Sequence, residues 1–216
     1  MRFDAVIFDF DGVLVISEHL NVEAMATTMK LRGTPLTPEE IATIPGKSSA
    51  DALPEFLRRR GVFEKDHAAI IEENRARYDH LWESGIAIAP HAEDVIHFLH
   101  HLQVSLAIGT TNRRPAVNKF LDRLHAHRLF PVVVTGQDVA KRKPHPEVYL
   151  TVQSRLGVSA EKILVVEDTP VGLAAAKAAK LTCAVIPSEF FKNEDFGEAD
   201  LMLGSLQDLP AIVLRP

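Results

Sequence analysis

The sequence has little of what secreted and membrane proteins usually contain. Its single cysteine, Cys183, cannot form an internal disulfide, so nothing points to an oxidising compartment. The apolar stretch near the N-terminus is broken early by Asp9 and Asp11, which fits neither a signal peptide nor a membrane span. We therefore expect a cytoplasmic protein that does not associate with membranes.

The sequence also lacks a surplus of positive charge. Its 24 lysines and arginines are outnumbered by 29 aspartates and glutamates, which gives a formal net charge of −5. This balance argues against a surface built for nucleic acid or anionic lipid. With 46% hydrophobic residues among 216, the chain can bury a substantial core. A monomer is the expectation, although the composition does not demand one.

Short apolar runs in five places have the character of buried parallel strands. They cover residues 5–8, 104–108, 132–134, 163–166 and 183–186. Stretches with helical spacing alternate with the later runs, at residues 93–102, 115–124, 146–156 and 171–179. This alternation predicts an α/β fold with a doubly wound, Rossmann-like parallel sheet, whose active site lies at the carboxyl ends of the strands.

A long helical insertion interrupts this rhythm after the first predicted strand. It runs from about Ser17 to Gly85, with turn signals at residues 32–35, 44–46 and 60–61. We therefore expect a core domain of residues 1–16 and 86–216. Residues 17–85 would form a helical cap domain over the active site.

The strongest motif runs from Phe8 to Leu14, directly after the first predicted strand. Its two carboxylates, Asp9 and Asp11, are two residues apart and would project into one pocket, and Gly12 lets the chain turn sharply there. One carboxylate could attack phosphorus while the other exchanges a proton with the attacking or leaving oxygen, provided that their environments differ. Taken alone, the motif could also be a pair of turn aspartates.

Two further motifs supply groups that suit phosphate. A predicted strand leads into Thr110, Thr111 and Asn112, whose polar groups beside a helix start could bind phosphate oxygens. Such residues also cap helices, which is the alternative interpretation. Lys143 lies in a basic turn and would offset the charge of a carboxylate nucleophile and a phosphate. The alternative is an ordinary basic loop before a helix.

The fourth motif places Glu167 and Asp168 at the end of another buried strand. Mg²⁺ prefers one or two carboxylates, completed by waters and substrate phosphate. Asp9 and Asp168 could supply these ligands together with the backbone carbonyl of Asp11, although Asp168 could instead be a helix N-cap. Because all four motifs lie at carboxyl ends of predicted parallel strands, together they predict a site for phosphoryl transfer.

These residues resemble the haloacid dehalogenase superfamily along the whole chain. Asp9-Phe10-Asp11-Gly12-Val13-Leu14 resembles its first motif, Thr110 its second, Lys143 its third, and Glu167-Asp168-Thr169-Pro170 its fourth. The insertion, with Gly46-Lys47-Ser48-Ser49, is similar to the α-helical cap of the β-phosphoglucomutase-like phosphatases. Thr111 remains an alternative for the second motif, because predicted strand ends are uncertain by a residue or more.

The resemblance implies a phosphatase that acts on a small phosphorylated metabolite, such as a sugar phosphate. Asp9 would attack phosphorus and form an aspartyl-phosphate. Asp11 would protonate the leaving alcohol and then activate water, while Thr110 and Lys143 would fix the transferring phosphoryl group.

The resemblance also implies Mg²⁺ as the cofactor. Its ligands would be Asp9, the carbonyl of Asp11 and Asp168, with Glu167 supporting the ion directly or through water. Contacts with substrate are implied for the remaining motif and cap residues, which are Gly12, Lys47, Ser48, Thr111 and Asn112.

The chain departs from its relatives at several positions outside the four motifs. An aspartate and a histidine of many relatives are replaced by Ile16 and Asn21, and cap residues of the mutases are replaced by Ser49 and Glu73. These departures argue against the nearest alternative, a phosphosugar mutase. Lys180 falls at a helix C′ position that favours glycine, at a cost of about 1 kcal/mol.

The same motifs disfavour two other functions. Haloacid dehalogenase chemistry does without the second aspartate and the metal, so the presence of Asp11 argues against it. A non-catalytic metabolite-binding protein would have no need of the intact set of catalytic and metal residues, which are Asp9, Asp11, Thr110, Lys143 and Asp168.

Overall fold

The computed structural model describes residues 2–214. Contacts within the chain divide it into two compact units. The described residues up to Val15 and from Ile88 onward form the first, here called the α/β unit, and Ile16–Ala87 form the second, here called the helical unit. Among residues 2–214, no helix is long and apolar enough to cross a membrane.

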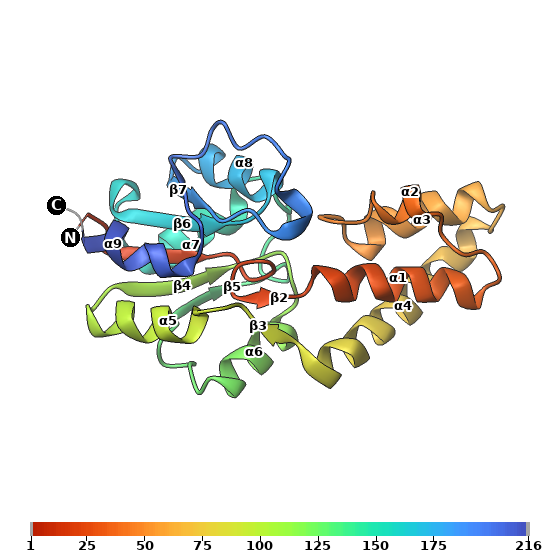
Figure 1. The fold of residues 1–216 in the computed structure, drawn as a ribbon, viewed down its shortest axis with the longest axis horizontal. Helices are drawn as coiled ribbons and strands as arrows, with labels where there is room; N and C mark the ends of the chain where they lie inside the picture. Colours follow the sequence, from red (N-terminus) through yellow and green to blue (C-terminus); the bar gives the residue numbers. More distant parts are fainter. Residues whose placement is uncertain (1, 215–216) are drawn as a thin grey trace. The chain divides into compact units, whose positions relative to one another are not determined.

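The α/β unit is built on one six-stranded parallel sheet, in the order β5-β4-β1-β6-β7-β8 (Figure 1). Strand β1 lies between β4 and β6, and all of its residues are buried. Because the strand order reverses at β1, the carboxyl ends of these three strands border a topological switch point, where α/β sheets place their sites. The strands are β1 (Ala5–Phe8), β4 (Ser105–Gly109), β5 (Val132–Val134), β6 (Ile163–Glu167), β7 (Thr182–Val185) and β8 (Leu201–Met202).

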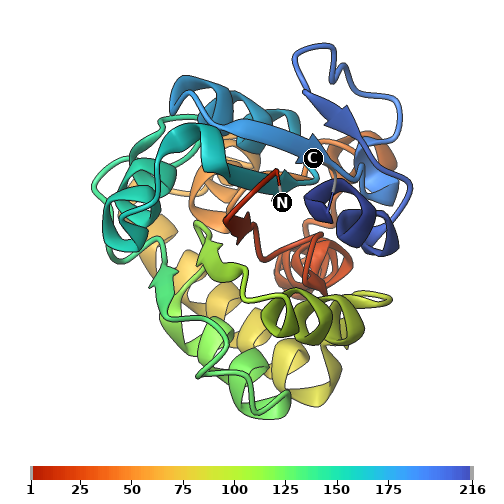
Figure 2. The ribbon, with the colours of Figure 1, turned by 90° about the vertical axis from the view of Figure 1, so that its left-hand side faces the viewer.

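Helices cover both faces of this sheet. Figure 2 shows α5 and α9 on one side and α7 and α8 on the other. Alternation along β1 sends Ala5 and Ile7 to the side of α7 and α8, where they share one apolar core with Tyr149 and Leu173. The helices are α5 (Ala92–His101), α6 (Arg114–Arg123), α7 (Glu147–Leu156), α8 (Pro170–Ala178) and α9 (Leu209–Leu214), with 3₁₀ turns at Ala160–Lys162, Glu189–Phe191 and Leu206–Asp208.

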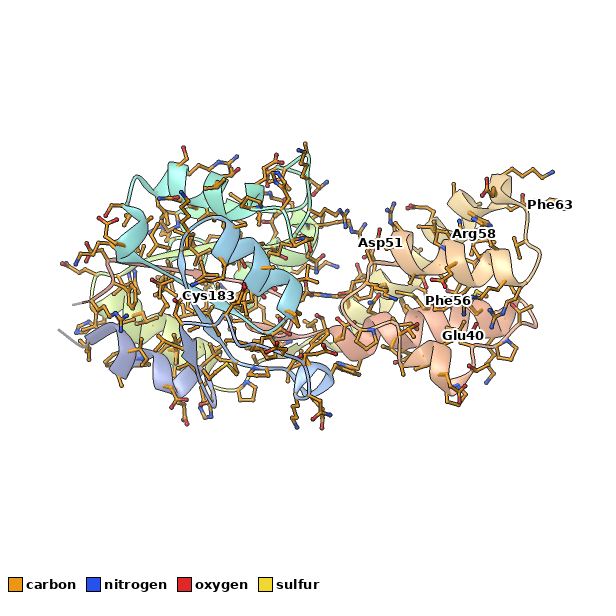
Figure 3. The ribbon with its side chains drawn as sticks, turned by 90° about the horizontal axis from the view of Figure 1, so that it is seen from above. Glu40, Asp51, Phe56, Arg58, Phe63 and Cys183 are labelled. Carbon is orange, nitrogen blue, oxygen red and sulfur yellow. The ribbon has the colours of Figure 1, made fainter. Side chains whose placement is uncertain are left out.

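The predicted α/β fold with a doubly wound parallel sheet is confirmed. Two predicted strands, at residues 5–8 and 132–134, have the observed bounds, and the other predicted strands and helices of this unit differ by one residue at one or both ends. Lys180 follows the C-cap of α8 with a φ of +60°, so its predicted left-handed position is confirmed. Cys183 is buried in β7, inside the α/β unit (Figure 3).

The helical unit packs three longer helices and one short one around its own core. Phe56 lies inside this unit, whereas Phe63 projects from its surface (Figure 3) and is 72% exposed. The core includes Met25, Met29, Ile44, Leu53, Phe56 and Leu57. The helices are α1 (Glu18–Leu31), α2 (Pro38–Ile41), α3 (Ser49–Arg59) and α4 (Glu64–Gly85).

Polar contacts also join the helices of this unit. The buried Thr28 hydroxyl of α1 donates to Asn74 Oδ1 of α4 at 3.1 Å. Glu73 forms ion pairs with Arg32 and Arg77, so it serves as a link between α1 and α4. These contacts give the helical unit a defined structure of its own, while its predicted role as a cap domain stays a prediction.

The chain passes between the two units through two short strands. β2 (Val15–Ile16) and β3 (Ala87–Ile88) pair with each other as a separate two-stranded sheet. Neither strand was predicted, because two residues are too few to show a period in the sequence.

Candidate active site

The carboxyl ends of four neighbouring strands bring the predicted motif residues together. Asp9 follows β1, Thr110 follows β4, Glu167 ends β6 and Asp168 comes directly after it. Lys143 reaches the same group from the segment between β5 and α7. Parallel strands that end at the same edge of a sheet thus gather side chains that are distant in sequence, such as Asp9 and Lys143, which are 134 residues apart.

The backbone at the end of β1 allows a close approach to the neighbouring strand. The amide of Asp9 donates to the carbonyl of Val166 at 2.9 Å, which extends the pairing of β1 with β6. Gly12 has a φ of +80°, and a Cβ atom there would lie 1.9 Å from Oδ2 of Asp168. Glycine is therefore required at this position both by the left-handed backbone and by the nearby carboxylate.

The ammonium of Lys143 is the centre of the site. Its Nζ lies 2.8 Å from Asp9 Oδ1, 2.7 Å from Glu167 Oε1 and 2.8 Å from the hydroxyl oxygen of Tyr149. An ammonium has three N–H groups, so these three acceptors use all of them. The lysine side chain is only 7% exposed, and its two carboxylate partners leave the cluster with excess negative charge.

Both oxygens of Glu167 accept hydrogen bonds from the protein. Oε1 accepts from Lys143 and from the hydroxyl of Tyr149. Oε2 accepts from the Asp168 amide at 3.1 Å and from the Thr169 hydroxyl and amide at 3.3 and 3.5 Å. With five donors around a fully buried carboxylate, Glu167 is held in one orientation by its own surroundings.

Asp168 is in a different situation. Its Oδ1 is buried and has no hydrogen-bond partner among residues 2–214. One oxygen each from Asp9, Glu167 and Asp168 lies within 4.8 Å of the others. An unpartnered carboxylate oxygen in an acidic cluster fits a divalent cation, because hard cations take oxygen ligands. The residues present are therefore suited to hold one.

The pKa values of Asp9, Asp168 and Lys143 reflect the excess of negative charge in this cluster. Burial raises the pKa of Asp9 to about 7, with Glu167 and Asp11 adding to the effect and Lys143 opposing it. Burial, with the charges of Glu167 and Asp9, also raises the pKa of Asp168 well above its ordinary value. Burial alone would lower the pKa of Lys143, but the carboxylates of Asp9 and Glu167 outweigh it and raise that pKa.

Asp11 lies in a more open environment than Asp9. It is half-buried, and its carboxylate accepts from the amide Nδ2 of Asn112 at 2.9 and 3.1 Å. The Asn112 backbone amide donates to the hydroxyl of buried Thr110 at 2.9 Å. The two aspartates of the first motif thus differ in their partners, as a division of roles between them requires.

The assignment of the second motif to Thr110 stays a prediction. Thr110 is 1% exposed and comes directly after β4, whereas Thr111 is half-buried. A Cβ atom at Gly136 would lie 2.3 Å from the carbonyl oxygen of Thr111, so the backbone of the two segments is in close contact.

Two predicted substrate contacts, Lys47 and Ser48, belong to the helical unit. Their loop is held by the first turn of α1. Glu18 Oε1 accepts from the Gly46 amide at 3.1 Å, and the side-chain amide of Asn21 donates to the Lys47 carbonyl at 3.0 Å. The contact of this loop with substrate stays a prediction.

Tyr149 joins the site although its position in the sequence did not single it out. It lies within a stretch of helical spacing, residues 146–156, where a tyrosine can be an ordinary core residue. The one available signal was chemical, because a buried tyrosine needs a partner for its hydroxyl, and Lys143 and Glu167 are those partners.

Comparison with known proteins gives a consistent result. The family model described as "Haloacid dehalogenase-like hydrolase" matches residues 6–186. A phosphorylated carbohydrates phosphatase from Thermotoga maritima is 32% identical over 179 residues, which cover 82% of this chain and 81% of that protein. The validoxylamine A 7'-phosphate phosphatase of Streptomyces hygroscopicus subsp. limoneus is 29% identical, with 96% of each chain covered. A crystal structure of mutant CbbY from Rhodobacter sphaeroides in complex with xylulose-(1,5)bisphosphate matches with a TM-score of 0.82, at 28% identity and 96% coverage of each chain.

Proposed function

The chain belongs to the haloacid dehalogenase-like hydrolase family, and from this premise we propose that it hydrolyses the phosphate monoester of a small phosphorylated metabolite. The observation that carries the proposal is the buried pair of Asp9 and Lys143, 2.8 Å apart at the carboxyl edge of the sheet. One relative is named for phosphorylated carbohydrates and one related structure holds a sugar bisphosphate, which makes sugar phosphates the first substrate class to test.

We propose Asp9 as the nucleophile. A carboxylate oxygen of Asp9 attacks phosphorus, the bond from phosphorus to the alcohol oxygen breaks, and an aspartyl-phosphate forms. Asp11 gives a proton to the leaving alcohol and then takes one from the water that hydrolyses the intermediate. Asn112, which donates to both oxygens of Asp11, supports this role by fixing the orientation of the carboxyl group.

The acidic cluster supports a divalent cation, and Mg²⁺ is the ion we propose. Asp9, Asp168 and the backbone carbonyl of Asp11 would hold it, with Glu167 oriented behind them. When bound, the ion would neutralise phosphate charge and orient the phosphoryl group for attack.

The phosphoryl oxygens need donors from the protein itself. Thr110 and Lys143 are proposed to fix them, as the sequence predicted, with Gly12, Thr111 and Asn112 lining the same edge of the sheet. Since all three N–H groups of Lys143 already have acceptors, a phosphoryl oxygen would have to take over one of them.

The helical unit is proposed to select the substrate. In this proposal residues 17–85 act as the cap domain, and Lys47 and Ser48 contact the part of the substrate that does not react. The exposed Lys47 side chain and the held backbone of its loop support a contact of this kind.

The contacts in the helical unit favour a phosphatase over a mutase. Asn21 carries a neutral amide, which cannot exchange a proton as the histidine of many relatives could. Glu73 stands where the mutases have a cationic cap residue. Its carboxylate forms ion pairs with Arg32 and Arg77, so it cannot bind an anionic substrate group as a cation would.

The test is phosphate release from a panel of phosphorylated metabolites, led by sugar phosphates, with Mg²⁺ and with a chelator. We expect metal-dependent release confined to a few substrates and lost in Asp9→Asn. Interconversion of hexose phosphates that depends on a bisphosphate would favour the mutase instead. Folded wild-type protein that binds Mg²⁺ and releases phosphate from no compound would contradict the proposal.

A further inference from the structure

Tyr149 is a buried core residue whose hydroxyl lies in the charged centre of the site. Its exposed fraction is 0%, and it shares an apolar core with Val148 and Val152 of the same helix. The fit around its ring is close, because a Cβ atom at Gly109 would lie 3.2 Å from the ring. Phenylalanine would meet this packing requirement equally well, so packing does not explain the hydroxyl.

The hydroxyl closes a triangle of hydrogen bonds with Lys143 and Glu167. The ammonium of Lys143 can only donate, so it donates to the Tyr149 oxygen at 2.8 Å. The tyrosine proton is then free to go to Glu167 Oε1, which also accepts from Lys143 at 2.7 Å. The direction of each bond in the triangle is thus fixed by the chemistry of its members.

This triangle determines where the remaining N–H of Lys143 points. Two of its three N–H groups are held by Tyr149 and Glu167, and the third is directed at Asp9 Oδ1, 2.8 Å away. Lys143 Nζ also lies 4.6 Å from the centroid of the Tyr149 ring, which adds a cation–π contact and limits movement of the ammonium toward the ring. Tyr149 therefore fixes the lysine in both rotation and position.

We propose that Tyr149 is a positioning residue for phosphoryl transfer, which directs the ammonium of Lys143 at Asp9 through its hydroxyl. The proposal rests on the proposed function of Asp9 as the nucleophile. Tyr149 touches neither the substrate nor the reacting atoms in this scheme. It acts through Lys143 and Glu167, the two groups that contact its hydroxyl.

Loss of the hydroxyl would leave two buried groups short of a partner. Lys143 would have an N–H without an acceptor, and Glu167 Oε1 would keep only one of its two donors. The ammonium could then rotate, and its hydrogen bond to Asp9 would be made for only part of the time. Because that bond sets the charge and orientation of the nucleophile, the chemical step should slow down more than substrate binding weakens.

The first test is Tyr149→Phe, which removes one oxygen and keeps the ring. We expect kcat for phosphate release to fall by about tenfold or more, while KM changes by less than about threefold. The matched control is Thr28→Val, which removes another buried hydroxyl with a side-chain partner, in the helical unit. Its kcat should stay within about twofold of wild type, and circular dichroism should show both variants folded.

The second test observes the lysine directly and needs no turnover. In ¹⁵N-labelled wild-type protein, we expect a slowly exchanging ammonium signal from Lys143, assigned by its loss in Lys143→Arg. In Tyr149→Phe, ammonium exchange should become at least about tenfold faster. A wild type that gives no such signal, an unchanged signal in Tyr149→Phe, or a kcat of that folded variant within twofold of wild type would overturn the proposal.

The two tests also separate this proposal from the function on which it rests. If wild-type protein releases no phosphate from any compound, the phosphatase assignment fails. The ammonium measurement would still decide whether the Tyr149 hydroxyl orders Lys143.

Discussion

The two units of the molecule use charged side chains in opposite ways. The helical unit has ion pairs at its surface, such as Arg59 with Glu55, whose side chains are 57% and 50% exposed. In the α/β unit, Lys143 and Glu167 are 7% and 0% exposed, and the lysine is shared with Asp9. Surface ion pairs lose little hydration and contribute little to folding stability. Burying a charge carries a large desolvation penalty, so a buried charge is expected to have a role that offsets this penalty.

The pKa values show the same contrast. A hydrogen bond from Arg60 and another from the Thr37 backbone lower the pKa of Glu40, in the helical unit, to about 2. Burial raises the pKa of Asp9, in the α/β unit, to about 7. The surroundings of Glu40 thus favour its charged carboxylate form, whereas the surroundings of Asp9 favour its neutral carboxylic acid form when no metal ion is bound. A site of the second kind is poised to bind a cation.

The largest expected effect comes from removing the buried charge that we propose reacts. Asp9→Asn should lower kcat by roughly 10⁴-fold or more, because it removes the nucleophile. Its thermal midpoint should equal or exceed that of wild type, since a neutral amide relieves repulsion between buried carboxylates. The matched control, Glu40→Gln in the helical unit, should keep its kcat within about twofold. Activity near wild type in Asp9→Asn would remove Asp9 from the mechanism.

Asp11→Asn should have the next largest effect. Loss of a general acid and base should slow both formation and hydrolysis of the phosphoenzyme by roughly 10²–10⁴-fold. Rapid-quench measurements under single-turnover conditions would follow the two steps separately. Unchanged rates of both steps would exclude Asp11 from proton transfer.

Removing a cation from each unit compares the two kinds of ion pair directly. Lys143→Met should lower the free energy of unfolding by about 3–5 kcal/mol, because it leaves buried carboxylates uncompensated. Arg59→Met, which breaks the exposed pair with Glu55, should lower it by less than about 1 kcal/mol. Urea denaturation near pH 8, with chelator, would measure both values. Equal losses in the two variants would break the comparison between the units.

A further effect is expected from pH. In metal-free folded protein Asp9 has a pKa of about 7, against 3.8 ordinarily, so it keeps a proton that the unfolded chain releases. Its contribution to stability therefore falls as pH rises between these values.

The same proton competes with the metal. The dissociation constant for Mg²⁺ should rise by at least about tenfold for each pH unit below about 7, because the ion must displace the proton of Asp9 and any proton held by Asp168. Calorimetric titration at several pH values would measure this, with Glu40→Gln as the control that keeps the dependence. A dissociation constant that does not change with pH would contradict the raised pKa.

Much of the fold could be predicted because its signals are local. The strand at residues 5–8 is a short apolar run next to a turn, and it has the predicted bounds. The strained position of Lys180 followed from the end of a helical pattern. β8, with two residues at the edge of the sheet, and β2 and β3 are too short to show a period.

The candidate site could be predicted as a set of residues but not as a network. Sheet topology brings Asp9, Lys143, Glu167 and Asp168 together, and the carboxyl ends of parallel strands indicated this beforehand. The role of Tyr149 depends on the direction in which α7 points the tyrosine hydroxyl. The spacing of residues in the sequence does not specify that direction. For the same reason the sequence did not distinguish the enclosed carboxylate of Glu167 from the unpartnered oxygen of Asp168.

The central claim is that Asp9 carries the phosphoryl group, and trapping this intermediate tests it most directly. Protein mixed with substrate and Mg²⁺ would be quenched in acid within a turnover, reduced with borohydride, digested and analysed by mass spectrometry. The account predicts modification at Asp9 in the wild-type protein and none in Asp9→Asn. Phosphate release at the wild-type rate with no modified Asp9 at any time point would contradict it.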